Sequence, residues 1–172
     1  MRRAVEVVRT YLELRTPEQL RGAGLADPSV RFVHRRDIDI EHYRRLYRDV
    51  GRRWHWRDRD AWSDEMLAAH LSRPEVAVWE CLVGGESAGY FELEHSGDSV
   101  EIAYFGLAPD FVGRGLGKAM LTRAVQEAFA LGGVRVWLHT CTLDSPRALP
   151  NYLARGFTPT RRERYVAEVT DD

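Results

Sequence analysis

Three glycines at alternate positions, Gly113, Gly115 and Gly117, precede a helical pattern, and Lys118, the single lysine of the chain, follows them. A helix N-terminus exposes unpaired backbone N–H groups and a partial positive charge. Glycines let such a backbone approach an anion closely because they carry no Cβ. Arg114 and Lys118 add positive charge at the same place. The stretch VGRGLGK therefore predicts a binding site for a phosphate or pyrophosphate group.

Two common nucleotide-binding motifs do not fit this stretch. A P-loop needs Ser or Thr directly after its Gly-Lys pair, whereas Ala119 follows Lys118. A dinucleotide fingerprint needs GxGxxG and an acidic residue at the end of the next strand. Here the glycines run GxGxG, and the next strand ends in His139 and Thr140. A plain tight turn without a ligand remains the alternative interpretation.

The elements that must position this turn follow from hydrophobic periodicity and from turn residues. Strands are predicted at residues 4–14, 30–36, 75–83, 87–95, 99–107, 134–142 and 161–169, and helices at residues 40–51, 63–71, 115–131 and 145–156. Short glycine-containing turns join the third, fourth and fifth strands, which favours an antiparallel meander. The strand–helix–strand order that follows implies one parallel pair in a mixed sheet.

Composition narrows the class of protein. The length of 172 residues fits one domain spanning residues 1–172, and 44% hydrophobic with 30% charged residues is typical of a globular chain. The net charge of -1 gives no overall attraction to nucleic acid or to an anionic membrane, so neither is an expected partner. Two cysteines, Cys81 and Cys141, form neither a disulfide scaffold nor a metal-site spacing, and no metal is expected. The N-terminus lacks the apolar core of a signal peptide, and no apolar run could span a bilayer. A soluble, cytoplasmic protein is therefore expected.

Two motifs carry a resemblance to a known family. In VGRGLG, Gly115 and Gly117 match the later positions of a (Gln/Arg)-x-x-Gly-x-(Gly/Ala) motif that opens a helix, and Val112 stands where Gln or Arg is usual. In NYLARGF, Tyr152 and the pair at 156–157 match a Tyr-x-x-x-Gly-Phe ending. With these motifs, residues 88–157 resemble the GNAT superfamily of N-acetyltransferases.

The resemblance implies a fold, a co-substrate and a set of contacts. The expected fold is a single GNAT-like α/β domain with a central mixed, mostly antiparallel sheet that is splayed at the CoA site and has helices on both faces. The co-substrate is acetyl-CoA, and a homodimer is a possible assembly. The residues expected to contact CoA are Leu107, Ala108, Val112, Gly113, Arg114, Gly115, Leu116, Gly117, Lys118 and Ser145. Ser145 stands where the family usually has Asn.

Two of these residues have an assigned backbone role. The N–H and C=O of Leu107 would pair with the pantetheine amides as an added strand does, and the N–H of Leu107 or Ala108 would polarise the thioester carbonyl. Pro109 has no N–H to offer.

Acetyl transfer to an amine also needs a base for the amine and an acid for the leaving thiolate. By resemblance, Glu101 is the expected base, with Glu92 and Glu94 as rivals that could act through a water molecule. Tyr152 is the expected acid, ahead of His139. Cys141 is interpreted as a small apolar filler and not as a nucleophile that carries the acetyl group.

The acceptor is the least constrained part of the prediction. The connection at residues 52–62 would form one wall of its cleft, with Trp54, Trp56 and Trp62 available to hold an apolar body or a cation. The glutamates would favour a positively charged amine. A small-molecule primary amine is the first choice, a protein or peptide amine is the second, and a non-catalytic CoA-binding or sensing module is the competing class.

Overall fold

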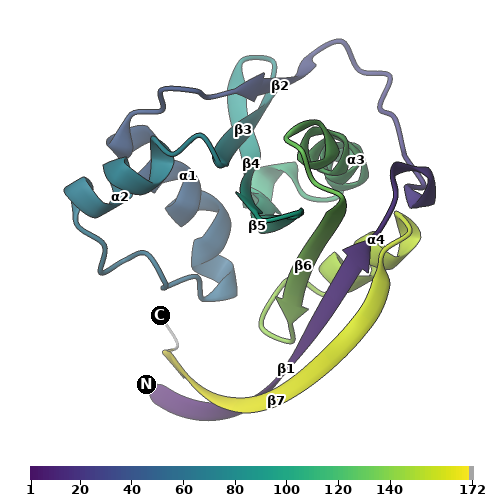
Figure 1. Cartoon of the computed structure of the whole chain (residues 1–172). Coiled ribbons are helices and arrows are strands. Elements are labelled where there is room, and N and C mark those ends of the chain that lie inside the picture. The colour runs from purple at the N-terminus through teal and green to yellow at the C-terminus, as the bar shows by residue number, and fades with distance from the viewer. Residues whose placement is uncertain (171–172) are drawn as a thin grey trace.

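A computed structural model describes residues 1–170 of the chain. Seven strands form one sheet in the order β2-β3-β4-β5-β6-β1-β7 (Figure 1). The strands are β1 (Arg2–Leu14), β2 (Val30–His34), β3 (Val76–Val83), β4 (Glu86–Ser96), β5 (Ser99–Leu107), β6 (Arg135–Cys141) and β7 (Thr158–Thr170). The helices are α1 (Ile40–Gly51), α2 (Asp64–Leu71), α3 (Leu116–Ala130) and α4 (Ala148–Ala154), with 3-10 turns η1 (Pro17–Gln19), η2 (Arg52–Trp54) and η3 (Pro109–Phe111).

The order of the elements confirms the predicted mixed α/β fold. Strands β2 to β5 pair antiparallel with their neighbours, and β5 pairs parallel with β6 through the crossover helix α3. Strand β1 pairs antiparallel with both β6 and β7, so the first strand of the chain lies between its last two strands. The periodicity predicted β1 itself, but not its partners.

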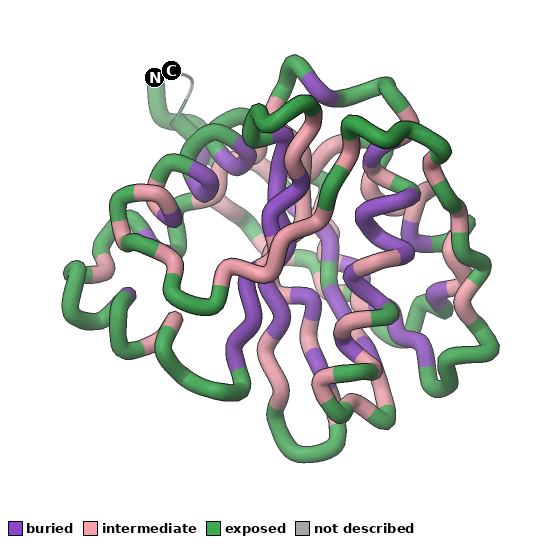
Figure 2. Tube along the Cα trace, turned by 90° about the horizontal axis from the view of Figure 1, so that it is seen from above, coloured by how far each residue is buried: buried purple, intermediate pink, exposed green. Residues whose placement is uncertain are grey.

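Helices cover both faces of the sheet, as predicted, and each face has its own hydrophobic core. The larger core lies under α3 and α4 and includes the buried side chains of Phe91, Met120 and Leu138. The smaller core lies under α1 and α2 and is rich in aromatic rings, including Tyr43 and Tyr90. Figure 2 shows the buried positions running through the middle of the molecule, with exposed positions on the outer loops and turns.

Strands β1 and β7 form a long curved two-stranded ribbon beyond the end of β6 (Figure 1). Their register runs from Arg2↔Thr170 to Glu13↔Thr158, whereas β6 pairs only with the second half of β1, from Arg9↔Cys141 to Leu14↔Val136. The ribbon therefore brings β1 side chains to the end of β6 at which the functional site lies.

The first two helices begin at the residues whose side chains can cap them. Asp39 accepts from the N–H of Glu41 at the start of α1, and Ser63 accepts from the N–H of Met66 at the start of α2, as predicted for Ser63. At the end of α1 a Cβ on Gly51 would lie 2.4 Å from the ring of Trp56. Glycine at this position is what lets the connection between α1 and α2 fold back against the helix.

Helix α4 begins later than predicted. The periodic pattern placed its start at Ser145, but residues 145–147 form a turn, in which the C=O of Ser145 accepts from the N–H of Ala148. Within residues 1–170, no helix combines the length and apolar character needed to cross a bilayer.

Candidate active site

The site begins where two neighbouring strands separate. Strands β5 and β6 pair only from Ser99↔Arg135 to Glu101↔Trp137, and the rest of β5 runs on without β6 beside it. The sheet is therefore splayed from Glu101 onward, as the resemblance predicted. A row of backbone groups on β5 faces this gap.

The register of β4 with β5 shows which backbone groups those are. Ala108 donates its N–H to the C=O of Ala88, and Leu107 lies opposite Gly89. In an antiparallel pair, hydrogen-bonded and non-hydrogen-bonded positions alternate. The N–H and C=O of Leu107 therefore point away from β4 and into the gap. Of the two expected donors, Ala108 is committed to β4 and Leu107 faces the site.

The glycine turn lies at the far end of β5, just before α3. Gly113 has φ +86° and Gly115, the N-cap of α3, has φ +78°, conformations that favour glycine. No side chain caps this helix, so no capping side chain accepts hydrogen bonds from the N–H groups of its first turn. The turn and the start of α3 therefore have the backbone geometry of an anion-binding N-terminus.

Some side chains of this turn line the cavity and others do not. Val112 and Lys118 line the cavity described below, together with the backbone of the three glycines. Leu116 is buried in the larger core. Arg114 lies over the ring of Phe111, 5.0 Å from its centroid, and is not among the cavity-lining residues, so the charge contribution expected of it stays a prediction.

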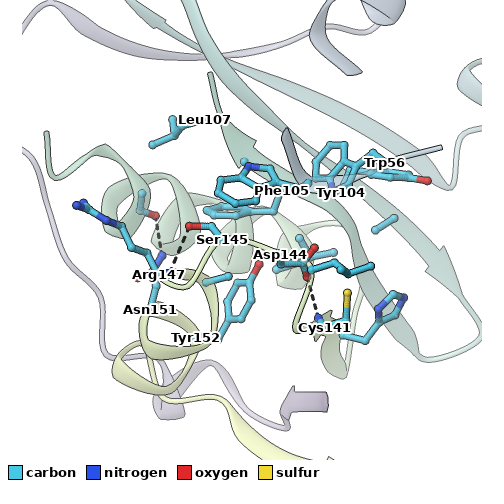
Figure 3. Close-up of a pocket in the computed structure, with 18 of the residues that line it drawn as sticks. Trp56, Tyr104, Phe105, Leu107, Cys141, Asp144, Ser145, Arg147, Asn151 and Tyr152 are labelled. Carbon is cyan, nitrogen blue, oxygen red and sulfur yellow. Dashed lines mark hydrogen bonds between the residues drawn. The ribbon is translucent and has the colours of Figure 1, made fainter. Parts of the chain in front are cut away.

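Helix α4 supplies polar groups that the sequence analysis missed (Figure 3). The side chain of Asn151 donates to the C=O of Gly117 at 3.2 Å and so ties α4 to the first turn of α3. The guanidinium of Arg147 lies 3.4 Å from where a Cβ on Gly113 would be. Arg155 also lines the cavity, and its buried Nε has no protein acceptor among residues 1–170. Arginines are frequent throughout this chain, so the sequence alone did not single these out.

The loop after β6 is held by one carboxylate. Asp144 accepts from the hydroxyl of Thr140 at 2.6 Å and from the N–H of Cys141 at 2.8 Å. This places Ser145 on the cavity wall, where its hydroxyl accepts from the N–H of Arg147 at 3.3 Å. Ser145 thus lies in the expected place, although its hydroxyl already has a partner.

One cavity of about 1020 Å³ joins the glycine turn to the splayed strands. It continues past β5 to the aromatic connection between α1 and α2 and to the ribbon of β1 and β7. Of the expected residues, the cavity-lining ones are Glu101, Leu107, Val112, Gly113, Gly115, Gly117, Lys118, Ser145 and Tyr152. The structure therefore brings both expected catalytic residues and the glycine turn to a single cleft.

Glu101 lies at the point where β5 and β6 separate, with its side chain 25% exposed. Burial and, after it, the negative charges of Glu94 and Glu92 raise the pKa of its carboxyl to about 7, against the opposing charge of Arg59. The nearest cationic candidate is Nε2 of His139, 4.0 Å from Oε1. A carboxyl with a pKa near neutrality is well placed to take up a proton at physiological pH.

The two rival glutamates are committed to arginines. Glu92 is fully buried, and its carboxylate accepts from both terminal nitrogens of Arg59 at 2.6 Å. It also accepts from the hydroxyl of Tyr43 at 2.7 Å, and Nε2 of His70 lies 3.1 Å away. Burial opposes its ionisation, but the hydrogen bonds from His70 and Arg59 outweigh this and lower its pKa.

Glu94 has a more exposed partner. Its carboxylate accepts from Arg73 at 2.8 Å, with side chains 29% and 44% exposed respectively. Of the three glutamates on this face, Glu101 is therefore the one without an arginine partner among residues 1–170.

Tyr152 is buried on α4, with its ring edge-on to Phe105 and Phe157. Figure 3 shows it beside the loop that carries Asp144 and Ser145. Burial raises the pKa of its phenol, so the hydroxyl stays protonated and able to donate at neutral pH. Burial also raises the pKa of the Cys141 thiol, which fits its interpretation as an unreactive neutral side chain.

The three tryptophans of the connection between α1 and α2 all line the cavity. Trp56 packs edge-on against Tyr104 and against Tyr90, whereas Trp62 lies edge-on to His70. Arg59 lies over the rings of both Trp62 and Tyr104, at 4.9 and 4.6 Å. The Arg59–Glu92 pair therefore ties this wall to strand β4. Among residues 1–170, no three His, Cys, Asp or Glu side chains are arranged to hold a metal ion.

A sequence model described as the acetyltransferase (GNAT) family matches residues 43–157. The chain belongs to this family. The match contains the glycine turn, the splayed part of β5 and the Tyr152 motif, and it confirms the resemblance drawn from these residues. It does not contain strands β1 and β7.

One curated relative is a mycothiol acetyltransferase from Cellulomonas flavigena, which is 32% identical over 100 residues. The match covers 55% of this chain and 28% of that protein, so the chain corresponds to less than a third of the relative's length.

Similar solved structures share the fold at low identity. A GCN5-related N-acetyltransferase from Kribbella flavida has a TM-score of 0.66 at 16% identity, over 96% of this chain and 58% of that one. A GCN5-related N-acetyltransferase from Sphaerobacter thermophilus has a TM-score of 0.67 at 15% identity, over 98% and 52%. An aminoglycoside acetyltransferase from an uncultured soil metagenomic sample has a TM-score of 0.63 at 17% identity, over 76% and 90%.

Proposed function

We propose that this chain transfers the acetyl group of acetyl-CoA to a primary amine of a small molecule by direct attack. The observation that carries the proposal is the position of Glu101. A carboxyl with a pKa of about 7 lies where β5 and β6 separate, in the same cavity as a capless helix N-terminus. A base and an anion site in one cleft are what amine acetylation by a CoA thioester requires.

The glycine turn fits the pyrophosphate of CoA. The N–H groups at the start of α3 would hold its oxygens, and Lys118 and Arg147 lie close enough to the turn to add charge. The outward N–H and C=O of Leu107 would pair with the pantetheine amides in the gap left by β6. These contacts would deliver the thioester to the splayed region beside Glu101.

The reaction also requires a balanced set of proton transfers. Glu101 takes a proton from the acceptor ammonium, and the neutral amine attacks the thioester carbonyl carbon. The C–N bond forms and the C–S bond breaks, while the N–H of Leu107 is available to the oxygen that becomes negative. The phenol of Tyr152 donates its proton to the departing thiolate, and the resulting phenolate takes the second proton that the attacking nitrogen loses as it becomes the amide nitrogen. The proton on Glu101 passes to solvent when the products leave. Every role falls on a residue that lines the cavity.

The choice of a small molecule is supported by the acceptor end of the cavity. The wall formed by Trp54, Trp56 and Trp62 presents an aromatic surface, and Asp58 adds negative charge that would attract an ammonium group. Two similar proteins are named for small-molecule acetylation, the mycothiol and the aminoglycoside acetyltransferases. A protein or peptide amine is the second choice.

The test begins with calorimetric titration by acetyl-CoA, free CoA and NAD. Micromolar binding of both CoA compounds and no binding of NAD is the expected result. Release of the CoA thiol is then followed over a panel of primary amines. Glu101→Gln should bind acetyl-CoA as the natural protein does and lose about 10²- to 10⁴-fold in kcat.

Two results would overturn the proposal in different ways. Absence of CoA binding would mean that the site, in which Val112 and Ser145 replace residues usual in the family, does not hold this ligand. Normal CoA binding without turnover of any amine would favour the non-catalytic CoA-binding or sensing module.

A further inference from the structure

Arg9 lies on β1, opposite Cys141 of β6, and lines the same cavity as Glu101. Its Nη2 donates to the hydroxyl of Tyr165 at 3.4 Å, and its guanidinium lies 4.9 Å from the centroid of the Tyr165 ring. Its Nε is buried and has no acceptor among residues 1–170. A guanidinium held against an aromatic ring with unused donors is prepared to bind something that the protein does not supply.

The other arginines at the acceptor end of the cavity already have carboxylate partners. Arg59 pairs with Glu92, and Arg73 pairs with Glu94. Within residues 1–170, no carboxylate oxygen lies within 4.0 Å of a nitrogen of Arg9. Arg9 thus presents a positive charge to the cavity that no neighbouring acid neutralises.

The acids nearest to Arg9 are occupied elsewhere. Glu163, which faces Arg9 across the β1–β7 register, accepts from the hydroxyl of Tyr11 and pairs with Arg161. Asp144 accepts from the loop after β6, as described above. Internal pairing therefore does not satisfy the Arg9 guanidinium.

We propose that Arg9, held by Tyr165, binds an oxyanion carried by the acceptor, so that the acceptor is a primary amine bearing a carboxylate or a phosphate. The inference rests on the proposed function, since it assigns the second end of the same substrate. A guanidinium presents its N–H donors in a planar fork that matches either oxyanion with two hydrogen bonds. The ring and hydroxyl of Tyr165 contact the guanidinium and help to hold it in place.

The positions along β6 limit the shape of such an acceptor. Glu101 is in register with Trp137, and Arg9 with Cys141, so the two sites are four residues apart along β6, roughly 13 Å of strand. His139 lies between them, with Nε2 4.0 Å from Glu101. Burial and, after it, the charge of Arg9 lower the pKa of His139, which fits the closeness of the two side chains. The amine and the oxyanion of the acceptor should therefore be separated by several bonds.

This subsite lies outside the part of the chain that matches the family. Arg9 and Tyr165 both fall beyond residues 43–157 and come from the two strands of the ribbon. The ribbon thus adds a specificity-determining group to a cleft whose other parts lie within the matched span.

The test compares three acceptors that share one primary amine on one alkyl chain: aminohexanoate, the matching aminoalkyl phosphate and the uncharged aminohexanamide. For the natural protein, kcat/KM for at least one anionic acceptor should exceed that for the amide by about tenfold or more, the effect of one charge-assisted hydrogen bond. Whether the carboxylate or the phosphate is preferred identifies the oxyanion. Arg9→Met should bring the ratio to about one, and Arg9→Lys should keep part of the preference.

Arg164→Met is the matched control. Arg164 also lies on the ribbon, next to Tyr165, but its side chain is exposed, pairs with the exposed Glu6 and does not line the cavity. Its loss should leave the ratio as it is in the natural protein. A ratio near one in the natural protein, or a ratio that Arg9→Met does not alter, would overturn the subsite.

A binding measurement separates this inference from the proposed function. The same three compounds are titrated into the protein with free CoA present, and tryptophan fluorescence is followed. If an anionic compound binds the natural protein but not Arg9→Met while no amine is acetylated, the subsite stands and the proposed function fails. If all three are acetylated equally, the function stands and the subsite fails. If none binds the natural protein at millimolar concentration, the subsite also fails.

Discussion

The two halves of the cleft are built in different ways. On the side proposed to hold CoA, the available groups are the backbone N–H and C=O of Leu107 and of the turn at residues 113–118, set by two glycines at positive φ. On the side proposed to hold the acceptor, the available groups are side chains from the α1–α2 connection, from β4 to β6 and from the ribbon. A backbone site restricts residue type strongly and locally, because few residues tolerate its conformation. A side-chain site can be assembled from any elements that the fold brings together.

The difference explains what the family motif reports. The glycine motif lies in the half in which backbone geometry requires glycine, so it points to the co-substrate that the family shares. It contains no residue of the half proposed to select the acceptor. Variants placed in one half of the cleft or the other therefore test whether the two halves act differently, and they also test the proposed function.

The largest expected effect concerns the acceptor half. Arg59→Met should lower the free energy of unfolding by about 3–5 kcal/mol, because it leaves the buried carboxylate of Glu92 without its bidentate partner. Burial opposes the charge on Arg59, but its hydrogen bonds to Glu92 outweigh this and raise its pKa, so the pair is ionised in the natural protein. Chemical denaturation measures the change. The control is Arg73→Met, whose partner Glu94 is partly exposed, and its loss should cost less than about 1 kcal/mol. Equal losses in the two variants would contradict the role assigned to the buried pair.

The second effect is a gain of stability from removing the proposed base. Because folding raises the pKa of Glu101 from 4.5 to about 7, the folded state retains a proton that the unfolded chain releases. Its contribution to stability is thus present at low pH and is lost as pH rises through that interval. At pH 8 the free energy of unfolding of Glu101→Gln should be about 1–3 kcal/mol larger than that of the natural protein. At pH 4 the two values should differ little. Glu94→Gln, which breaks an ion pair, should show no such gain. A Glu101 variant that is destabilised at pH 8 would count against the buried position of this carboxyl.

The third effect concerns the CoA half. Gly115→Ala places a side chain at φ +78°, in the turn that faces the ligand, and should weaken acetyl-CoA binding about tenfold, with a loss of stability of about 1 kcal/mol from backbone strain. Gly85→Ala is the matched control, since Gly85 has φ +82°, with no atom within 4 Å of an added Cβ, and lies in the β3–β4 turn. It should lose similar stability and keep full affinity. Calorimetry and thermal unfolding measure the two quantities, and a similar loss of affinity in both variants would mean that the turn acts only through stability.

The smallest effect is a displacement of the pH profile. The proposed base must be ionised to act, so kcat/KM should fall about tenfold for each pH unit below a midpoint near 7. Glu94→Gln removes a negative charge that, after burial, raises the pKa of Glu101, and should move the midpoint to lower pH by less than about one unit. Rates measured from pH 5 to about 9 with a saturating acetyl-CoA concentration test this. A midpoint that moves upward would contradict the proximity of the two carboxylates.

Local signals in the sequence predicted the elements around the glycine turn in detail. The start of α3 at the glycine turn, the meander of β3 to β5 and the parallel crossover all depend on residue types within a few positions of one another. The helix that carries Tyr152 was predicted three residues too long at its start, because Ser145 to Arg147 form a turn whose polar residues resemble a helix beginning.

The acceptor half could be predicted only in outline. The sequence indicated that Trp54, Trp56 and Trp62 lie on one connection and that Glu92 and Glu94 share a face of one strand. It gave no means of pairing Arg59 with Glu92, which are 33 positions apart, and hence no means of telling the paired glutamates from Glu101. Burial and partners separate these residues, and both are properties of the packed chain.

The sequence by itself determined the family, the order of the elements and the place of the glycine turn, because each depends on local conformational preference and periodicity. Only the tertiary structure decided that β1 enters the sheet between β6 and β7, and with it that Arg9 reaches the cleft. Strand periodicity shows which residues share a face but carries no information about which distant strand lies alongside. That pairing depends on the summed packing of strands from both ends of the chain.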